Sequence, residues 1–266
     1  MFKMVMRGVL LLWCMSTVVP AGAQSKASDY QAVALARTSY VALTSGTVIT
    51  DVTLTASVAS IDGSDTDTGT ATLLAKGNAR SRLDLNTSEG TRSEVRNVGT
   101  DRVPVGKRVD FEGRSYSEST HNCWGIASWF FPHMSPLYAS DPSIVVKYVG
   151  LESRKGVSVH HLRTYGSSPT VDSSAPASLK SLGAVDYYLD ASTFLPVAIQ
   201  FNVHPDNDAL NGLLVEVDFS DYRPTNGVLV PTHVLRFQQG NLMLDIRVTS
   251  SIINTGLSDS QFAVEN

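Results

Sequence analysis

The sequence predicts a mainly β protein (α+β) built from antiparallel strands, with one helix near its start. Apolar and polar residues alternate with a period of two in one run after another, as from Val52 to Val58, which is typical of strands with one buried face. Tight-turn sequences such as Asn226-Gly227 separate neighbouring runs and indicate hairpins. No helix-length segments alternate with these runs, which argues against a parallel α/β sheet.

The helix is predicted over residues 28–43. Ser28 and Asp29 are candidate N-caps, and apolar residues follow at helical spacing. These residues are Ala32, Leu35, Ala36, Tyr40 and Leu43. Strands are then predicted at residues 47–60, 68–76, 79–86, 91–98, 105–111, 144–151, 157–164, 184–190, 197–203, 213–222, 229–236 and 242–253.

Residues 1–23 have the pattern of a cleaved secretory signal peptide. Lys3 and Arg7 form a positive head, an apolar run follows, and Ala21-Gly22-Ala23 is an Ala-x-Ala cleavage site. The apolar run is shorter than the roughly 20 residues that a membrane-spanning helix needs. We therefore expect cleavage near Ala23, a periplasmic or secreted mature chain, and no transmembrane segment after cleavage.

The composition of the remaining chain excludes several classes of protein. Removal of the signal takes away Lys3 and Arg7 but no acid, which makes the net charge of −4 more negative, so we expect no nucleic-acid partner. Cys123 is then the single cysteine, which excludes an internal disulfide and leaves stability to a hydrophobic core. No change of composition marks a linker, so residues 24–266 are expected to form one domain.

Residues 121–139 interrupt the strand pattern with a dense set of large apolar side chains. Pro132 and Pro136 fall within this segment and indicate short helical pieces rather than a strand. Its candidate site residues are Trp124, Trp129, Phe130, Phe131 and Met134.

Three segments near the C-terminus have sequence patterns of strands separated by turns. Residues 185–201, VDYYLDASTFLPVAIQF, read as a strand, an Asp-x-x-Thr-x-x-Pro turn and a returning strand, and Asp and Thr side chains in such a turn can bond nearby backbone amides. Residues 215–234 and 245–264 read as a closing hairpin and a terminal segment. With the order of elements, these segments make the chain resemble the LolA-like periplasmic outer-membrane lipoprotein-sorting and carrier proteins.

The resemblance implies a single, strongly curved antiparallel half-barrel sheet, with helices on its concave side and an apolar cavity for acyl chains. The helical segment beginning at Cys123 falls where that family has a helical plug. The candidates for lining or covering a lipid site are then Trp124, Trp129, Phe130, Phe131 and Met134. Burying half of a 16-carbon chain is worth roughly 6 kcal/mol before the costs of binding. Aromatic residues facing a curved sheet are also ordinary core, and this alternative stays open.

The sequence carries no motif of an enzyme or of a metal site. There is no G-x-S-x-G, no H-E-x-x-H and no pair of cysteines after the signal. His121, Cys123 and His133 offer zinc-binding atoms, but a loop histidine beside a buried thiol is the simpler interpretation. We expect a non-enzymatic protein that needs no cofactor.

Two charged patterns have an ordinary and a functional interpretation. Asp62, Asp65 and Asp67 resemble part of a calcium loop, but no acid closes it and a polar hairpin turn fits better. Four arginines alternate with acids on the strands predicted at 79–86 and 91–98. Arg80, Arg82, Arg92 and Arg96 are these four. They suit cross-strand ion pairs on a solvated face, with an anionic head-group site as the alternative.

The expected function is that of an exported binding or carrier protein whose partner is a lipid, an acyl chain or a lipoprotein. The alternative is an envelope protein-interaction or sensor domain that has a filled core and no small-molecule ligand. A concave side with room for a ligand would favour the first, and a packed concave side the second.

Overall fold

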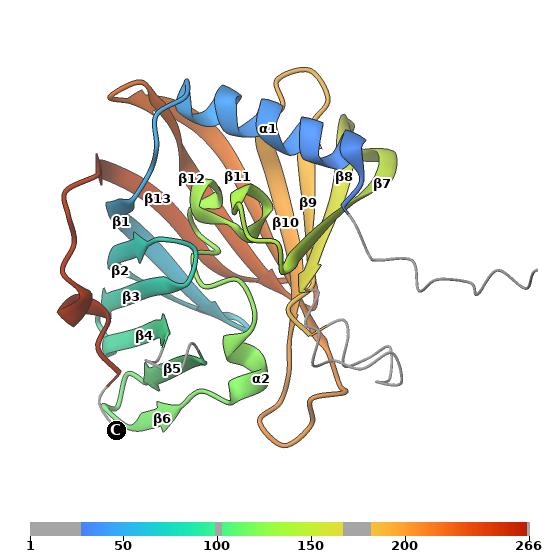
Figure 1. Ribbon diagram of the computed structural model, residues 1–266. Coiled ribbons are helices and arrows are strands. Elements are labelled where there is room, and N and C mark those ends of the chain that lie inside the picture. The colour runs from blue at the N-terminus through green and yellow to red at the C-terminus, as the bar shows by residue number, and fades with distance from the viewer. Residues whose placement is uncertain (1–27, 99–102, 167–181, 265–266) are drawn as a thin grey trace, which may run out of the picture.

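The computed structural model describes residues 28–98, 103–166 and 182–264 (Figure 1). The predicted signal peptide, residues 1–23, lies outside the described residues. Among the helices of the described part, none combines the length and the apolarity needed to cross a membrane.

All strands of the described chain belong to one antiparallel sheet of 13 strands. They are β1 (Asp51–Asp62), β2 (Asp65–Lys76), β3 (Arg80–Thr87), β4 (Gly90–Val98), β5 (Pro104–Val109), β6 (Ser115–Ser117), β7 (Ile144–Arg154), β8 (Val157–Gly166), β9 (Val185–Asp190), β10 (Pro196–Val203), β11 (Leu213–Thr225), β12 (Val228–Gln238) and β13 (Asn241–Ile253). All twelve predicted strands are present. The additional strand, β6, is short and fully exposed and so shows no alternation.

The order of strands explains the shape of the sheet. It runs β6-β5-β4-β3-β2-β1-β13-β12-β11-β10-β9-β8-β7, so β1 and β13 pair in the middle. β6 and β7 are consecutive in the sequence but form opposite edges that do not pair. The connection between them therefore crosses the concave side of an open, curved sheet (Figure 1). This arrangement confirms the predicted half-barrel.

The helical segments lie mainly on the concave side. They are α1 (Tyr30–Thr44), α2 (Thr120–Cys123) and three 3-10 turns, η1 (Pro132–Met134), η2 (Pro136–Tyr138) and η3 (Asp259–Phe262). α1 contacts both β12 and β7 and so spans the second half of the sheet (Figure 1). The Asp29 carboxylate accepts hydrogen bonds from Lys147 and from the backbone of Tyr148, which fixes the start of α1 to β7.

The segment that crosses the concave side folds as short turns. Pro132 and Pro136 each begin a 3-10 turn, where a fixed φ and a missing N–H cost nothing. Trp129, Phe130 and Phe131 pack from this segment against the apolar face of the sheet and form one continuous core with it. The predicted short helical pieces are therefore confirmed.

The turn after β9 has the hydrogen bonds that its sequence predicts. The Asp190 carboxylate accepts from the backbone amides of Ser192 and Thr193 at 2.8 and 2.7 Å, and the Thr193 hydroxyl accepts from the amide of Leu195 at 3.3 Å. These bonds satisfy the backbone donors of the turn.

A histidine between two carboxylates ties β7, β8 and β9 together on the outer face of the sheet. His161 Nδ1 lies 2.6 Å from Glu152 and Nε2 lies 2.6 Å from Asp186, while the neighbouring Leu162 faces the core. Burial lowers the pKa of His161, but the hydrogen bonds to the two carboxylates outweigh it and raise the pKa above its usual value.

This raised pKa predicts a loss of stability on the alkaline side. The stabilisation is complete below about pH 6.5, where both the folded and the unfolded imidazole are protonated, and is lost as the pH rises through the raised pKa. Urea denaturation at a series of pH values should show this loss, and His161→Gln should flatten it because glutamine does not titrate. An unchanged pH dependence in the variant would contradict the assignment.

Candidate ligand-binding site

A cavity of about 780 Å³ lies between α1 and the chain that leads into β7. We call it the α1 groove. Val33, Ala36 and Val41 line it from α1, and Leu137, Ile144 and Val146 line it from the opposite wall. The position follows from the fold, because α1 lies across the sheet edge and leaves a space beside its own core-facing side. Polar residues, among them Ser28, Arg37 and Asp141, also line this space.

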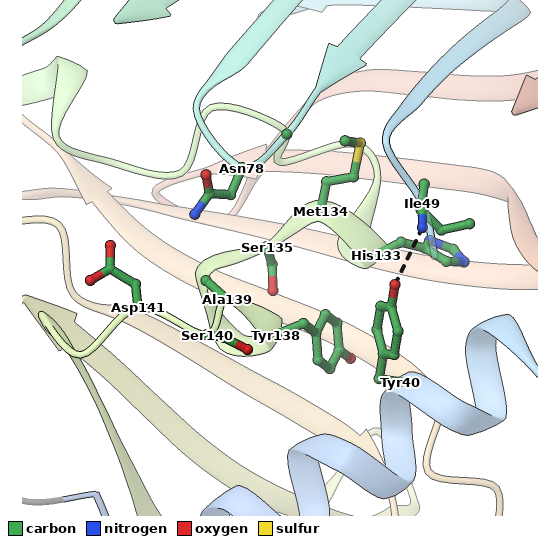
Figure 2. A pocket seen from close by; sticks show the side chains of 11 residues that line it. Tyr40, Ile49, Asn78, His133, Met134, Ser135, Tyr138, Ala139, Ser140 and Asp141 are labelled. Carbon is green, nitrogen blue, oxygen red and sulfur yellow. Dashed lines mark hydrogen bonds between the residues drawn. The ribbon is translucent and has the colours of Figure 1, made fainter. Parts of the chain in front are cut away.

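A second cavity of about 360 Å³ adjoins the α1 groove, and we call it the polar pocket (Figure 2). Its lining includes the polar side chains of Asn78, Ser135, Ser140 and Asp141. Both cavities have residues 138–141 and Tyr40 in their walls. A ligand with an apolar chain and a polar end would therefore meet matching surfaces in the two cavities.

Two tyrosines form the wall that the cavities share. The ring centroids of Tyr40 and Tyr138 are 5.3 Å apart, and the Tyr138 hydroxyl is hydrogen-bonded to the buried Ser39 at 2.7 Å. Burial raises the pKa of Tyr138, so its hydroxyl stays neutral. The wall is thus held by contacts between α1 and η2 and does not depend on ionisation.

His133 brings a neutral, buried imidazole to the polar pocket. Its Nε2 donates to the backbone oxygen of Leu229 at 2.8 Å, and the ring stacks on Phe131 with centroids 4.1 Å apart. Nδ1 is then a bare acceptor, buried and without a partner in the described part of the chain. Burial lowers the pKa of His133 to about 3, although the bond to Leu229 opposes the shift.

The structure divides the five site residues predicted from the sequence. Trp129, Phe130, Phe131 and Met134 are at most 4% exposed and belong to the core, whereas Trp124 is 57% exposed. Met134 lines the polar pocket, and the other four line neither cavity. A role for the five in ligand binding stays a prediction.

Sequence reasoning missed the residues that line the α1 groove. Val33 and Val41 lie outside the core-facing stripe that predicted the helix, and Val41 is 59% exposed. Apolar residues beyond the core-facing stripe of an amphipathic helix are the signal that would have pointed to this surface.

In the structure, the residues of the two patterns weighed as metal sites either lie apart or pair across a hairpin. His121 bonds to Ser119 and to the backbone oxygen of Pro205, whereas His133 lies at the polar pocket. Asp62 and Asp65 pair across the β1–β2 hairpin. In the described ranges, no three His, Cys, Asp or Glu side chains are grouped closely enough to hold a metal ion.

The four arginines of β3 and β4 lie on two different faces. Arg82 is on the outer face and pairs with Asp84 at 2.7 Å. On β4, Arg92 lies opposite Leu85 of β3, whose side chain is in the core. The expectation of one solvated face is therefore wrong for β4, whose charged residues project to the concave side.

No family model and no curated protein matches the sequence. Solved structures do match its fold. An outer-membrane lipoprotein-sorting protein domain from Vibrio parahaemolyticus, described as putative in its own name, has 12% identity and a TM-score of 0.55, over 86% of this chain and 95% of that one. A DUF1329 family protein from Desulfovibrio piger has 12% identity and a TM-score of 0.54, over 88% and 96%.

A LolA superfamily protein from Nitrosomonas europaea has 10% identity and a TM-score of 0.50, over 88% of this chain and 97% of that one. At these identities the likeness shows the fold alone.

Proposed function

We propose that this protein of LolA-like fold is exported to the periplasm, or secreted, and carries or binds a lipid or an acyl chain, including that of a lipoprotein, without catalysing a reaction. In this proposal residues 24–266 form its single domain. The observation that carries the proposal is the α1 groove, whose two walls present aliphatic side chains. The likeness of the fold to a domain named for outer-membrane lipoprotein sorting, and to a protein named as a LolA superfamily member, supports it.

The dimensions and chemistry of the groove suit such a ligand. Its volume of about 780 Å³ lies within the roughly 300–1,000 Å³ that ligand sites occupy. Each methylene buried there contributes about 0.8 kcal/mol, so a short length of acyl chain supplies useful affinity. At the adjoining polar pocket, the side chains of Asn78, Ser140 and Asp141 suit hydroxyl or amide groups at the polar end of an amphiphile.

A pair of substitutions in α1 tests the groove. Val33 is half-buried and lines the groove, whereas Ala34 is exposed and absent from its lining. Val33→Asp should weaken binding of a fluorescent long-chain fatty acid at least tenfold, because an apolar chain would bury a carboxylate. Ala34→Asp adds the same charge to the same helix and should change the affinity less than about twofold.

Mass spectrometry of organic extracts complements this titration. Protein purified from cell envelopes should carry a lipid, and the Val33→Asp protein should carry less. Equal weakening by both substitutions, or no saturable binding together with no extracted lipid, would refute the proposal.

A second candidate function, an envelope interaction or sensor domain, is favoured by one observation. Phe130 and Phe131 are almost fully buried and fill part of the concave side. Trp124 lies on the surface of the same segment. A photo-crosslinking residue at position 124 should trap one envelope protein in cells if this function holds. That result, with no bound lipid, would replace the carrier proposal.

A further inference from the structure

β4 and β5 lie in the half of the sheet away from α1 (Figure 1). Their register places a cluster of charged side chains on the concave side there. We call it the arginine cluster. Its members are Arg92, Glu94 and Arg96 of β4, Arg108 of β5, Glu118 before α2, and Arg236 of β12.

Strand register places these side chains on the core side of the sheet. Glu94 lies opposite Leu83 of β3 on one side and opposite Arg108 of β5 on the other, and Leu83 is in the core. Arg236 lies opposite the core residue Leu244, and its guanidinium carbon is 5.0 Å from the ring centroid of Trp129. The cluster therefore faces the segment that crosses the concave side.

Arg96 forms ion pairs with both carboxylates of the cluster. Arg96 Nη2 lies 3.6 Å from Glu94 and 3.5 Å from Glu118, and Nη1 donates to the backbone oxygen of Asn122 at 2.8 Å. Arg92, Arg108 and Arg236 form no ion pair and no hydrogen bond with any described residue. The Nε of Arg236 is buried and has no partner.

The cluster therefore holds four cations against two anions. The four arginines together pull the pKa of Glu94 below its usual value against the effect of burial, which shows that all of them act on the same carboxylate. Burial lowers the pKa of Arg236, and Arg92 and Arg96 lower it further, although Glu94 opposes them. Unpaired, partly buried guanidinium groups cost stability unless an anion reaches them.

We propose that the arginine cluster binds a small oxyanion, with Arg92, Arg108 and Arg236 as its ligands, and that the anion is a phosphate group, either free or at the head of a lipid. A guanidinium presents donors in a planar fork that matches phosphate oxygens. Arg108 lies over the Tyr116 ring and Arg236 over the Trp129 ring, but among the described residues no carboxylate pairs with any of the three forks. Arg108 is exposed and Arg92 and Arg236 are half-buried, so the cluster is open to an anion from solvent. The site is separate from the α1 groove and does not depend on the proposed acyl ligand.

Thermal unfolding in inorganic phosphate tests the site. At constant ionic strength, replacing chloride with phosphate should raise the Tm of the wild-type protein saturably, by about 5 °C at high occupancy. Arg92→Gln and Arg236→Gln should each raise the half-saturating concentration at least tenfold. Arg247→Gln is the matched control, because Arg247 is on the neighbouring β13, is 60% exposed and is not in the cluster; it should respond like the wild type.

The same variants separate ligand binding from a structural role. Without phosphate, Arg236→Gln should lower the Tm only slightly, because Arg236 has no ion pair or hydrogen bond to lose and gives up only the contact of its guanidinium with the Trp129 ring. Arg96→Gln should lower the Tm, because Arg96 holds Glu94 and Glu118. A loss of stability in Arg236→Gln as large as that in Arg96→Gln would overturn the assignment of Arg236 as a ligand.

Two amphiphiles identify the source of the phosphate group. If dodecyl phosphate half-saturates the rise of Tm at a far lower concentration than inorganic phosphate does, and dodecyl maltoside has no effect, the site takes a lipid head group. If the two phosphates half-saturate the rise at equal concentrations, the site takes the free anion. Both results require the effect to be lost in Arg92→Gln. The same rise of Tm in the wild type and in every variant is a general salt effect and would overturn the proposal, as would no rise at all.

Discussion

Replacing Phe131 with alanine is expected to lower the free energy of unfolding by about 3–5 kcal/mol, measured by urea denaturation. Phe131 is fully buried and stacks on His133. The segment around it is held in place, since Ser128 donates to the backbone oxygen of Met134 at 3.0 Å. The neighbours therefore have little freedom to collapse into the space that the ring leaves, and the cavity adds to the lost hydrophobic burial.

Trp124 provides the control for this experiment. It lies in the same segment but is 57% exposed, so Trp124→Ala should cost less than about 1 kcal/mol. Equal losses for the two substitutions would contradict the division into a buried core and an exposed rim. The Trp124→Ala protein also tests the predicted ligand role of that residue, because weaker fatty-acid binding at unchanged stability would support it.

Lowering the pH from about 6 to about 4 is expected to remove roughly 2–3 kcal/mol of stability through His133. The pKa of the buried imidazole is about 3 in the folded protein, against about 6.5 in the unfolded chain. Between these values the unfolded state binds the proton and the folded state does not. Stability therefore falls as the pH falls, by about 1.4 kcal/mol per pH unit.

His133→Gln isolates this effect in urea denaturation. Its side-chain amide offers an N–H to the backbone oxygen of Leu229, the partner of His133 Nε2, but cannot be protonated in this range. Between pH 4 and 6, the slope of the free energy of unfolding against pH should be smaller in the variant by about 1.4 kcal/mol per pH unit, which is the contribution of one proton. If wild type and variant follow the same slope, His133 is not neutral in the folded state.

The sequence predicted the strands well because period-two alternation reports a face that is buried. It failed on which face is buried in β4. Arg92, Glu94 and Arg96 alternate as a wet face would, yet they face the concave side. The opposite face is covered by η3, which packs against β3 and β4, and Val95 and Phe262 are both buried. No local pattern shows that a segment more than 160 residues away covers that face.

The candidate site was predicted only in part, for a similar reason. Aromatic density identified the segment that crosses the concave side, and its prolines identified the turns. The α1 groove, however, is a property of how α1 lies beside residues 137–146. The space between two elements depends on their placement, which neither element encodes alone, so Val33 and Val41 could indicate an apolar surface on the helix but not the cavity that it lines.

The pairing of β1 with β13 sets the order in which the molecule can be completed. Val52 lies opposite Ile253, so the first strand waits for the last before the two halves of the sheet are joined. Contacts this distant in the chain are slow to form, because closing a long loop is entropically costly before any pairing compensates for it. A nascent chain thus exposes the unpaired edge of β1 until β13 has been made, and the pairing of β13 with β1 then joins the two halves of the sheet.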